Sequence, residues 1–391
     1  MTPLTATWSF PTRILHGPGR IAELADACRG AGIRRPLFVT DAGLADSAIA
    51  ARALACLKSH SMTAPVFAEV RANPVAANVE AGVAAFRDGG HDGVIAFGGG
   101  SGLDAGKAVA FMSGQGRPIW DFEDIGDWWT RADPDGIAPV VAVPTTAGTG
   151  SEVGRAAVVL NEETHEKKII FHPKMMPAAV ICDPELTVGL PPHVTAATGM
   201  DAFTHCFEAY CAPGFHPMAD GVALQGLGLI VEHLPAAYED GANIVARSRM
   251  MAAASMGAVA FQKGLGAVHA IAHPVGALYD THHGLTNAVL LPYVMMHNRA
   301  AIETRMEHLA AVLGLSHPNF DAVLNHILYL REHMGIPHAL SGIGVDAGRA
   351  AEIGHFAAAD PSAGGNPVPV EAAALERIFR AAVAGSLEDA A

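Results

Sequence analysis

The chain is poor in charged and aromatic residues, which make up 16% and 6% of its 391 residues. It lacks any long run of Lys or Arg, and its formal net charge is -14. Nucleic acids and anionic membranes require a basic surface on their protein partners, so this charge balance argues against both. Half of the residues are apolar, which is typical of a compact, well-buried enzyme and not of a disordered chain.

Paired cysteines and long hydrophobic segments are also absent from the sequence. The five cysteines are an odd number and form no CxxC pair, so we expect reduced, mostly buried thiols. No apolar run reaches the ~18 residues that a membrane span requires. Residues 1–10 lack the basic and apolar parts of a signal peptide, so we expect a cytoplasmic protein.

The length exceeds the usual size of one compact core, so two domains are expected. In the first half, short β-rich runs alternate with Ala-rich segments of helical period, which predicts a largely parallel sheet covered by helices. After residue 192 the strand signal fades, and long Ala-, Leu- and Met-rich stretches predict a helical bundle. We therefore predict an α/β domain at residues 1–190 and an α-helical domain at 191–391. The predicted strands are 36–40, 66–70, 93–97, 139–143, 156–160 and 179–182, and the predicted helices include 46–60, 75–88, 102–112, 219–233, 244–261 and 302–313.

The first candidate metal ligands are Asp201 and His205. They stand four residues apart, so on a helix both side chains project from one face and can meet a single ion. One helix would then supply half of a coordination shell. The alternative is that Asp201 caps or pairs locally and that His205 is a hydrogen-bonded core residue.

A histidine cluster follows later in the chain. His269 and His273 repeat the four-residue spacing, Pro274 is expected to bend the chain after them, and His282 and His283 lie beyond that bend. One carboxylate and three neutral imidazoles suit Fe²⁺, Zn²⁺, Co²⁺ or Mn²⁺. Without a thiolate, such a set does not match a closed structural zinc site and can leave a position for substrate.

Two loops of the first half have the composition of a phosphate-binding site. Residues 98–101 (GGGS) directly follow a predicted strand and open a predicted helix, so backbone N–H groups would face a pyrophosphate. Residues 144–152 follow another strand and offer hydroxyl groups at the same edge of the sheet. Asp41, after the strand 36–40, would bind an adenosine ribose and repel a 2′-phosphate, favouring NAD over NADP. A tight turn at the glycines and a turn or N-cap role for Asp41 are the alternatives.

Taken together, these residues resemble the iron-containing, or group III, alcohol dehydrogenases, which also resemble glycerol dehydrogenase and dehydroquinate synthase. The resemblance extends from about Phe10 to beyond Asn298. The segments that carry it are GGGSGLDAGK at 98–107, PTTAGTGSEV at 144–153, DPELT at 183–187, GMDAFTH at 199–205, GLGAVH at 264–269 and HHG at 282–284.

This resemblance implies a Rossmann-like dinucleotide-binding domain and a helical metal-binding domain, the architecture of dehydroquinate synthase, with the active site in the cleft between them. Asp201, His205, His269 and His283 match four ligands of a catalytic divalent metal, usually iron with zinc as the alternative, and His273 matches a histidine beside the nicotinamide. The residues that match cofactor contacts are Asp41, Asn73, Gly98, Gly99, Gly100, Ser101, Thr145, Thr146, Thr149 and Lys167.

The implied reaction is hydride transfer between the carbon of a small primary alcohol and NAD(H), with the metal on the alcohol oxygen. A proton relay through ribose hydroxyls, water or His273 is expected. The resemblance also implies a homodimer or larger homo-oligomer. The alternatives are a lyase similar to dehydroquinate synthase with the same metal and NAD, and a metal- or nucleotide-binding protein without activity.

Two departures from the family pattern bear on the substrate. The run Phe261-Gln-Lys263 before the third ligand is one residue shorter than the common Phe-Ser-Asn-Ala and carries a cation. Arg155 lies in a segment where relatives commonly have Thr after Ser-Glu-Val. We hypothesise that Arg155 and Lys263, with Phe261 in the pocket wall, bind an anionic tail such as the carboxylate of a semialdehyde or ω-hydroxy acid. The alternative is two exposed or locally paired cations.

Overall fold

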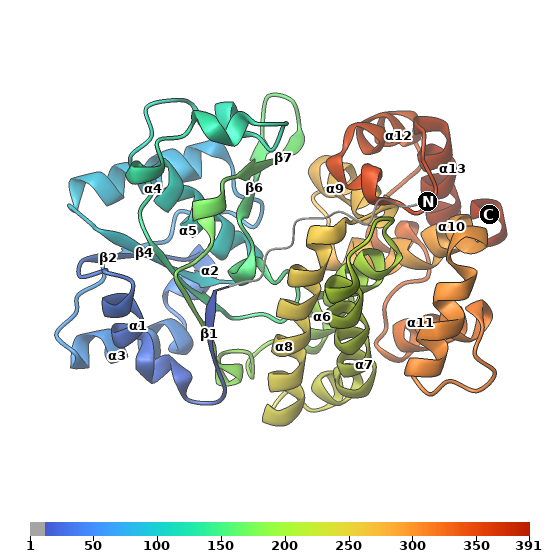
Figure 1. Cartoon of the computed structure of the whole chain (residues 1–391), viewed down its shortest axis with the longest axis horizontal. Coiled ribbons are helices and arrows are strands. Elements are labelled where there is room, and N and C mark those ends of the chain that lie inside the picture. The colour runs from blue at the N-terminus through green and yellow to red at the C-terminus, as the bar shows by residue number, and fades with distance from the viewer. Residues whose placement is uncertain (1–11) are drawn as a thin grey trace. The chain divides into compact units, whose positions relative to one another are not determined.

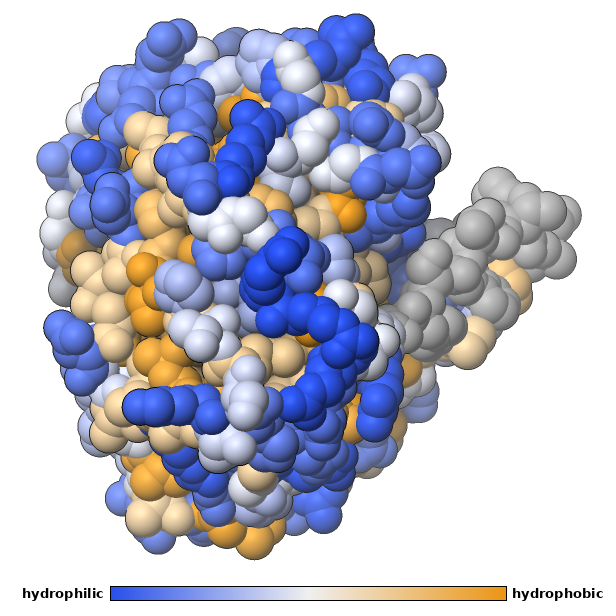
Figure 2. All heavy atoms as spheres, turned by 90° about the vertical axis from the view of Figure 1, so that its left-hand side faces the viewer, coloured by the Kyte–Doolittle hydropathy of each residue, from blue (hydrophilic) through white to orange (hydrophobic). Residues whose placement is uncertain are grey.

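The computed structural model describes residues 12–391 (Figure 1). Residues 1–11, on which the expectation of no targeting segment rests, lie outside the described residues. Contacts divide the chain between Gly189 and Leu190 into an α/β unit and a helical unit. None of the helices in the described part of the chain is long and apolar enough to cross a membrane. Hydrophilic and hydrophobic side chains are mixed on the face shown in Figure 2.

The α/β unit is built on six parallel strands in the order β1-β8-β5-β4-β2-β3. They are β1 (Arg13–His16), β2 (Pro36–Val39), β3 (Val66–Phe67), β4 (Gly93–Gly98), β5 (Val140–Pro144) and β8 (Ala179–Cys182). The strands β2, β4, β5 and β8 are buried along their whole length, because a parallel sheet is covered on both faces. The predicted α/β class with a parallel sheet is confirmed.

Helices cover both faces of this sheet. They are α1 (Leu24–Gly30), α2 (Ala42–Ala45), α3 (Ala48–Ser59), α4 (Ala76–Asp88) and α5 (Gly100–Met112). Side chains alternate along β4, so Ile95 and Phe97 face the cluster with α1 and α3 while Ala96 faces α5. At Gly106 of α5 an added Cβ would lie 2.5 Å from the Cβ of Ala96. Glycine therefore lets α5 approach the sheet closely.

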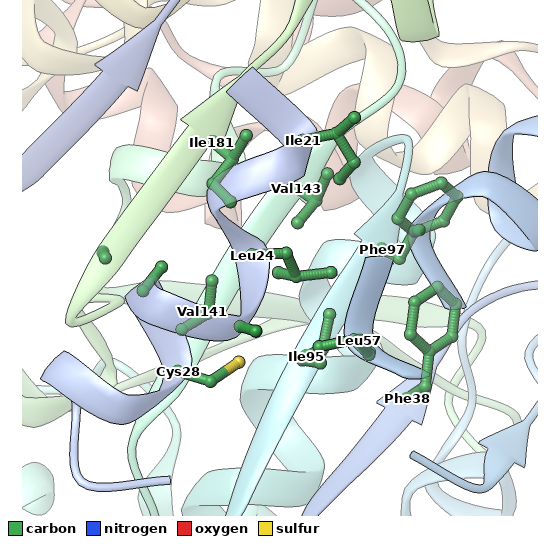
Figure 3. Close-up of a cluster of buried hydrophobic side chains, with 14 of the residues drawn as sticks. Ile21, Leu24, Cys28, Phe38, Leu57, Ile95, Phe97, Val141, Val143 and Ile181 are labelled. Atoms are coloured by element: carbon green, nitrogen blue, oxygen red, sulfur yellow. The ribbon is translucent and has the colours of Figure 1, made fainter. Parts of the chain in front are cut away.

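The core under α1 and α3 is one apolar cluster (Figure 3). The rings of Phe38 and Phe97 lie 5.0 Å apart in it, and Leu24 and Leu57 come from the covering helices. Because all of these side chains are fully buried, the cluster fixes β2 and β4, the strands whose ends carry predicted cofactor residues.

Two strands were not predicted, and one predicted strand has a different partner. The strand expected at 156–160 is present as β6 (Ala156–Asn161), but it pairs antiparallel with β7 (Glu166–Phe171) in a separate hairpin. The strand β7 escaped prediction because its sequence EKKIIF begins with three charged residues and only Ile170 is buried. The strand β1 has four residues and one buried side chain, Leu15, which is too short for a periodic signal.

The helical unit contains the long helices that the composition predicts. They are α6 (Pro192–Cys211), α7 (Pro217–Glu239), α8 (Ile244–Ala260), α9 (Ala267–Tyr279), α10 (His283–Val312), α11 (Phe320–His333), α12 (Ala350–Ala359) and α13 (Ala372–Ala384). The helix α6 packs against α7, α8 and α10, and α9 packs against α10 and α12. From Thr195 to Cys211 every residue of α6 is buried, so α6 is the central helix of this unit.

The prediction that the chain breaks at Pro274 and Gly276, before His282 and His283, is wrong. The helix α9 continues through Pro274 and Gly276 to Tyr279, and the direction changes at Asp280, whose φ is 51°. A proline within a helix removes one backbone hydrogen bond. Buried packing on both sides of Pro274 offsets that loss here, so His269 and His273 share one helix.

The Phe38–Phe97 contact gives a test of the core. We expect Phe97→Ala to destabilise the protein by about 3–5 kcal/mol, since a buried aromatic side chain leaves a cavity when truncated. The measurement is urea unfolding followed by circular dichroism. Val66 is 41% exposed on β3, so Val66→Ala is the control and should change stability by less than about 0.5 kcal/mol. Equal losses in both variants would contradict the assigned core.

Candidate metal and cofactor sites

The helix α6 places Asp201 and His205 on one face, as their spacing predicts. Both side chains are buried, although each carries polar atoms that need partners. Their ligand atoms and one of His269 from α9 all lie within 4.8 Å of one another. The His205 and His269 rings are stacked with their centroids 4.7 Å apart. Two helices therefore bring a carboxylate and two imidazoles to one point.

The side chain of Asn287, on α10, shows where these groups point. Its Nδ2 donates to Asp201 Oδ1 at 2.8 Å and lies 3.1 Å from His269 Nε2 and 3.2 Å from His283 Nε2. A carboxylate only accepts hydrogen bonds, so the contact with Asp201 fixes which end of the amide faces the cluster. Lone pairs from three of the four predicted ligands thus converge on one electropositive group.

The residues present fit a divalent cation. Burial lowers the pKa of His269 well below its ordinary value, and the neighbouring His205 lowers it further, so the imidazole is neutral as a metal ligand must be. The Nδ1 of His205 is buried without a hydrogen-bond partner among the described residues. Nitrogen and carboxylate ligands bind zinc at about 2.0–2.2 Å, so the three ligand atoms, which lie within 4.8 Å of one another, would move closer together to share one ion.

A second carboxylate, Glu208, supports the cluster from α6, and the sequence analysis missed it. Its Oε2 lies 2.6 Å from His269 Nδ1, and its Oε1 accepts the N–H of Val268 at 2.8 Å. Burial raises the pKa of Glu208 to about 7, although backbone N–H groups act in the opposite direction. The positions 201, 205 and 208 form one helical stripe, and this is the signal that would have found Glu208.

The remaining two histidines have different environments. The Nδ1 of His273 lies 2.7 Å from Asp360 Oδ2. Burial alone would raise the pKa of Asp360, but His273 and the hydrogen bonds of Ser362 hold it below its usual value. His282 accepts the N–H of Leu285 at 3.4 Å and caps α10. His282 therefore has a structural role one residue before the predicted ligand His283.

In the α/β unit, the carboxyl ends of the neighbouring strands β4 and β5 bring the two predicted cofactor loops together. The N–H of Thr145 donates to the carbonyl of Gly98 at 2.9 Å, and Thr149 lies against Gly100. Gly98 has φ 142°, a conformation that favours glycine. The backbone then enters α5, whose first N–H groups have no side-chain cap. This is the arrangement that binds phosphate at a helix N-terminus.

Asp41 has the N-cap role that the sequence analysis named as the alternative to ribose binding. Its Oδ1 accepts the N–H of Leu44 at 3.1 Å and caps α2. Its Oδ2 lies 3.5 Å from the position that a Cβ on Gly98 would take. The carboxylate therefore stands beside the glycine loop, where its charge opposes a second phosphate.

The other predicted cofactor residues gather at the same loops. The Ser101 hydroxyl donates to the carbonyl of Ala72, next to Asn73. Leu160 of β6 bridges to Val75 and pairs with Lys167 of β7, which brings Lys167 near the segment of Asn73. Thr146 lies against Gly99, 3.3 Å from the position of a Cβ there.

Two charged groups that the sequence analysis did not assign, the buried Lys107 and the partly buried Asp104, hold the second loop. The ammonium of Lys107, on α5, donates to the carbonyls of Ser151, at 2.9 Å, and Ala156. Asp104 accepts from the Ser151 hydroxyl and from the N–H of Val158, the latter at 2.9 Å. One turn of α5 therefore fixes the loop at 144–153. Asp104 and Lys107 are part of the GGGSGLDAGK motif, but their partners are distant in sequence.

The three residues hypothesised to bind substrate differ in their surroundings. The Phe261 ring lies 5.2 Å from the His205 ring, so it borders the metal cluster. The Lys263 side chain is 2% exposed, and its ammonium pairs with Asp220 at 2.5 Å. The guanidinium of Arg155 lies 5.5 Å from the centre of the Phe171 ring. The ammonium of Lys263 is therefore already paired with a carboxylate, which Arg305 also contacts at 3.5 Å.

Comparison with known proteins identifies the family. The family model described as "Iron-containing alcohol dehydrogenase" matches residues 11–184, and that described as "Fe-containing alcohol dehydrogenase family, C-terminal" matches residues 195–383. The chain belongs to the iron-containing alcohol dehydrogenases. The family resemblance and the Rossmann-like plus helical architecture predicted from the sequence are both confirmed.

Members of this alcohol dehydrogenase family are similar to the chain over most of their length. A 4-hydroxybutyrate dehydrogenase of Cupriavidus necator is 39% identical over 335 residues, which are 84% of this chain and 86% of the relative. A crystal structure of 1,3-propanediol oxidoreductase has a TM-score of 0.92 at 34% identity and covers 96% of this chain and 100% of its own. The NAD⁺ complex of sulfoacetaldehyde reductase from Bifidobacterium kashiwanohense has a TM-score of 0.88 at 28% identity, with 97% and 99% coverage.

The chain is therefore an NAD-dependent alcohol dehydrogenase of the iron-containing family, acting on a small-molecule alcohol or aldehyde. The family uses NAD(H) and a divalent metal, and the cluster of Asp201, His205 and His269 is a fitting metal site. The lyase alternative is not favoured, since these three relatives are a dehydrogenase, an oxidoreductase and a reductase.

The burial of the cysteines predicts which thiol reacts in the native protein. Burial raises the pKa values of Cys28, Cys206 and Cys211 to about 12, and Cys182 is also buried. Since only the thiolate is nucleophilic, we expect the native protein at pH 8 to react rapidly with Ellman's reagent at Cys56 alone. Cys56→Ser should abolish the rapid phase, and urea should expose the remaining thiols. A rapid phase that survives in Cys56→Ser would show that a buried cysteine is reactive.

Proposed function

We propose that this enzyme interconverts a short primary alcohol bearing an anionic end with its aldehyde. The proposed cation ligands are Asp201, His205, His269 and His283, with Fe²⁺ as the first candidate and Zn²⁺ as the second. The observation that supports this most directly is the convergence of three of these ligands on Asn287 Nδ2. Family membership supports the choice of reaction.

When bound, the cation supplies a Lewis acid for the substrate oxygen, and NAD(H) supplies the hydride acceptor or donor. The protein's own groups position and protect this chemistry. Phe261 beside His205 keeps water away from one side of the cluster. His273 donates from Nδ1 to Asp360, which leaves its Nε2 to take up or release a proton. We assign His273 as the proton-relay residue.

For the cofactor, we propose contacts from the loops of the α/β unit. The N–H groups at the start of α5, with Gly98, Gly99, Gly100 and Ser101, would bind the pyrophosphate. The proposed partners of the rest of the cofactor are Asp41, Asn73, Thr145, Thr146, Thr149 and Lys167. The carboxylate of Asp41 beside Gly98 supports NAD over NADP.

The names of two relatives support an anionic substrate. One acts on 4-hydroxybutyrate and the other on sulfoacetaldehyde, and both compounds carry an acidic group at the end opposite the reacting carbon. The buried pair of Lys263 with Asp220 makes Lys263 a poor anion receptor. We propose Arg155, the other cation hypothesised from the sequence, as the residue that binds the acidic end.

We also propose that the protein acts in the cytoplasm as a homodimer or larger homo-oligomer. Exposed apolar side chains on the helical unit, among them Phe215 and Met218, support self-association. Sedimentation velocity at micromolar concentration tests the oligomeric state, and a single species of 40.4 kDa would contradict it.

We expect the consumption of NADH by this enzyme to require a bound metal. Protein stripped of metal should not consume NADH with a four-carbon aldehyde acid, and anaerobic Fe²⁺ or Zn²⁺ should restore turnover. His205→Ala should stay inactive after reloading, because it removes a proposed ligand. The matched control is His282→Asn, which replaces the histidine cap of α10 by another good N-cap residue and should keep metal-dependent turnover. Full activity of the stripped enzyme would contradict the proposal.

The role of Arg155 predicts a selective loss. Arg155→Ala should raise KM for the four-carbon aldehyde acid on the order of 10–100-fold, because a charge-assisted hydrogen bond contributes about 1.5–3 kcal/mol. The KM for butanal, of equal length without the carboxylate, should change little. Arg71 pairs with Glu162 at the surface, so Arg71→Ala is the control and should leave both substrates unaffected. Equal losses on both aldehydes in Arg155→Ala would exclude the anion-binding role.

A further inference from the structure

Glu208 is a buried acid to which the reaction gives no role. Its side chain is 4% exposed, and a buried carboxylate is costly unless it is fully hydrogen-bonded. Its Oε1 meets the N–H of Val268 at 2.8 Å, at the first turn of α9. Gly266, the N-cap of α9, has no side chain to accept from that turn. One carboxylate oxygen of Glu208 is thus committed to the backbone of α9.

The other carboxylate oxygen faces a proposed metal ligand. Glu208 Oε2 lies 2.6 Å from Nδ1 of His269, and the opposite nitrogen, Nε2, lies 3.1 Å from Nδ2 of Asn287. That amide nitrogen is a donor, because it also donates to the carboxylate of Asp201. The NH2 group has two hydrogens for three contacts, and His269 Nε2 is the nearer of its two imidazole contacts, the other being His283 Nε2 at 3.2 Å. Because Nε2 faces this donor and Nδ1 faces the carboxylate of Glu208, the single proton of the neutral His269 ring belongs on Nδ1.

From this geometry we infer that Glu208 is a positioning residue of the metal site. Its carboxylate accepts the Nδ1 proton of His269, fixes that tautomer and ring orientation, and leaves Nε2 as a bare ligand toward Asp201 and His283. Carboxylates that hold metal-binding histidines in this way also raise the basicity of the ligand. The inference rests on the proposed metal-binding function, since it concerns how one of the four ligands is held.

The contacts of Glu208 predict how the variants Glu208→Gln and Glu208→Ala differ in metal binding. In Glu208→Gln the amide oxygen should stay on the N–H of Val268, which only donates. The NH2 group then faces His269 Nδ1 and donates to it, so the ring proton moves to Nε2 and blocks the ligand position. Glu208→Ala removes the carboxylate without imposing the wrong tautomer. The isosteric change is thus expected to harm metal binding at least as much as the truncation.

A matched control lies one turn along α9. His273 donates from Nδ1 to Asp360 in the same way, but His273 is not a proposed ligand. Asp360→Asn makes the same chemical change beside a neighbouring histidine. It should leave the affinity for Zn²⁺ unchanged, whatever it does to turnover.

The experiment measures Zn²⁺ affinity by competition with a chromophoric chelator, with thermal unfolding of the metal-free proteins as the folding check. We expect Glu208→Gln to bind Zn²⁺ on the order of 10–100-fold more weakly than wild type, no more tightly than Glu208→Ala, and to unfold within a few degrees of wild type. Wild-type affinity in Glu208→Gln together with a loss in Glu208→Ala would show that Glu208 only fills space and would overturn the inference. Equal losses in Glu208→Gln and Asp360→Asn would also overturn it.

Two further measurements separate this inference from the proposed function. His269→Ala should bind Zn²⁺ far more weakly than wild type, and equal affinities would refute the metal site itself. The imidazole ¹⁵N shifts of the wild-type protein, assigned by comparison with His269→Ala, report the tautomer without any change at Glu208. We expect the proton of His269 on Nδ1, and a proton on Nε2 would refute the role of Glu208 even if the variant does not fold.

Discussion

The N-terminus of α9 is buried, and the metal site depends on how its backbone donors are satisfied. Gly266 gives that helix no side-chain cap, so the N–H groups of Ala267 and Val268 donate to Asn366 and Glu208 from other parts of the chain. Buried N–H groups without partners would cost about 1–3 kcal/mol each. These two contacts set the position and rotation of α9, and with them the direction of His269 and His273.

The same carboxylate-to-imidazole contact occurs twice along α9, with different consequences. At His269 it leaves a nitrogen facing Asp201 and Asn287, among groups that suit a cation. At His273 the same contact leaves Nε2 as the second ring nitrogen, apart from the hydrogen bonds that join Asn287 to Asp201 and His269. One helix thus carries a ligand and a proposed proton carrier four residues apart, because each histidine is held by an acid from a different element. Pro274, directly after His273, does not interrupt the helix.

The features that could be predicted from the sequence are those encoded within one element or at its end. Asp201 and His205 share a helix, and the glycine loop follows its strand directly, so local spacing is sufficient. Glu208, Asn287 and Asp360 were missed because they act on partners 61, 86 and 87 residues away. The ion pair of Lys263 also depends on a distant residue, Asp220. Such pairings follow from tertiary packing, which a single sequence does not display.

Two hydrogen bonds of α9, those of Ala267 and His273, can form only late in the synthesis of the chain. Ala267 donates to a residue 99 positions later, and His273 to one 87 positions later. At about 5–20 residues per second, a ribosome makes α9 roughly 4–20 s before these partners exist. During that interval His273 lacks the carboxylate of Asp360 that orients it, whereas Glu208, the partner of His269, has already been made. The position of α9 and the orientation of His273 are therefore completed only after translation of nearly the whole chain.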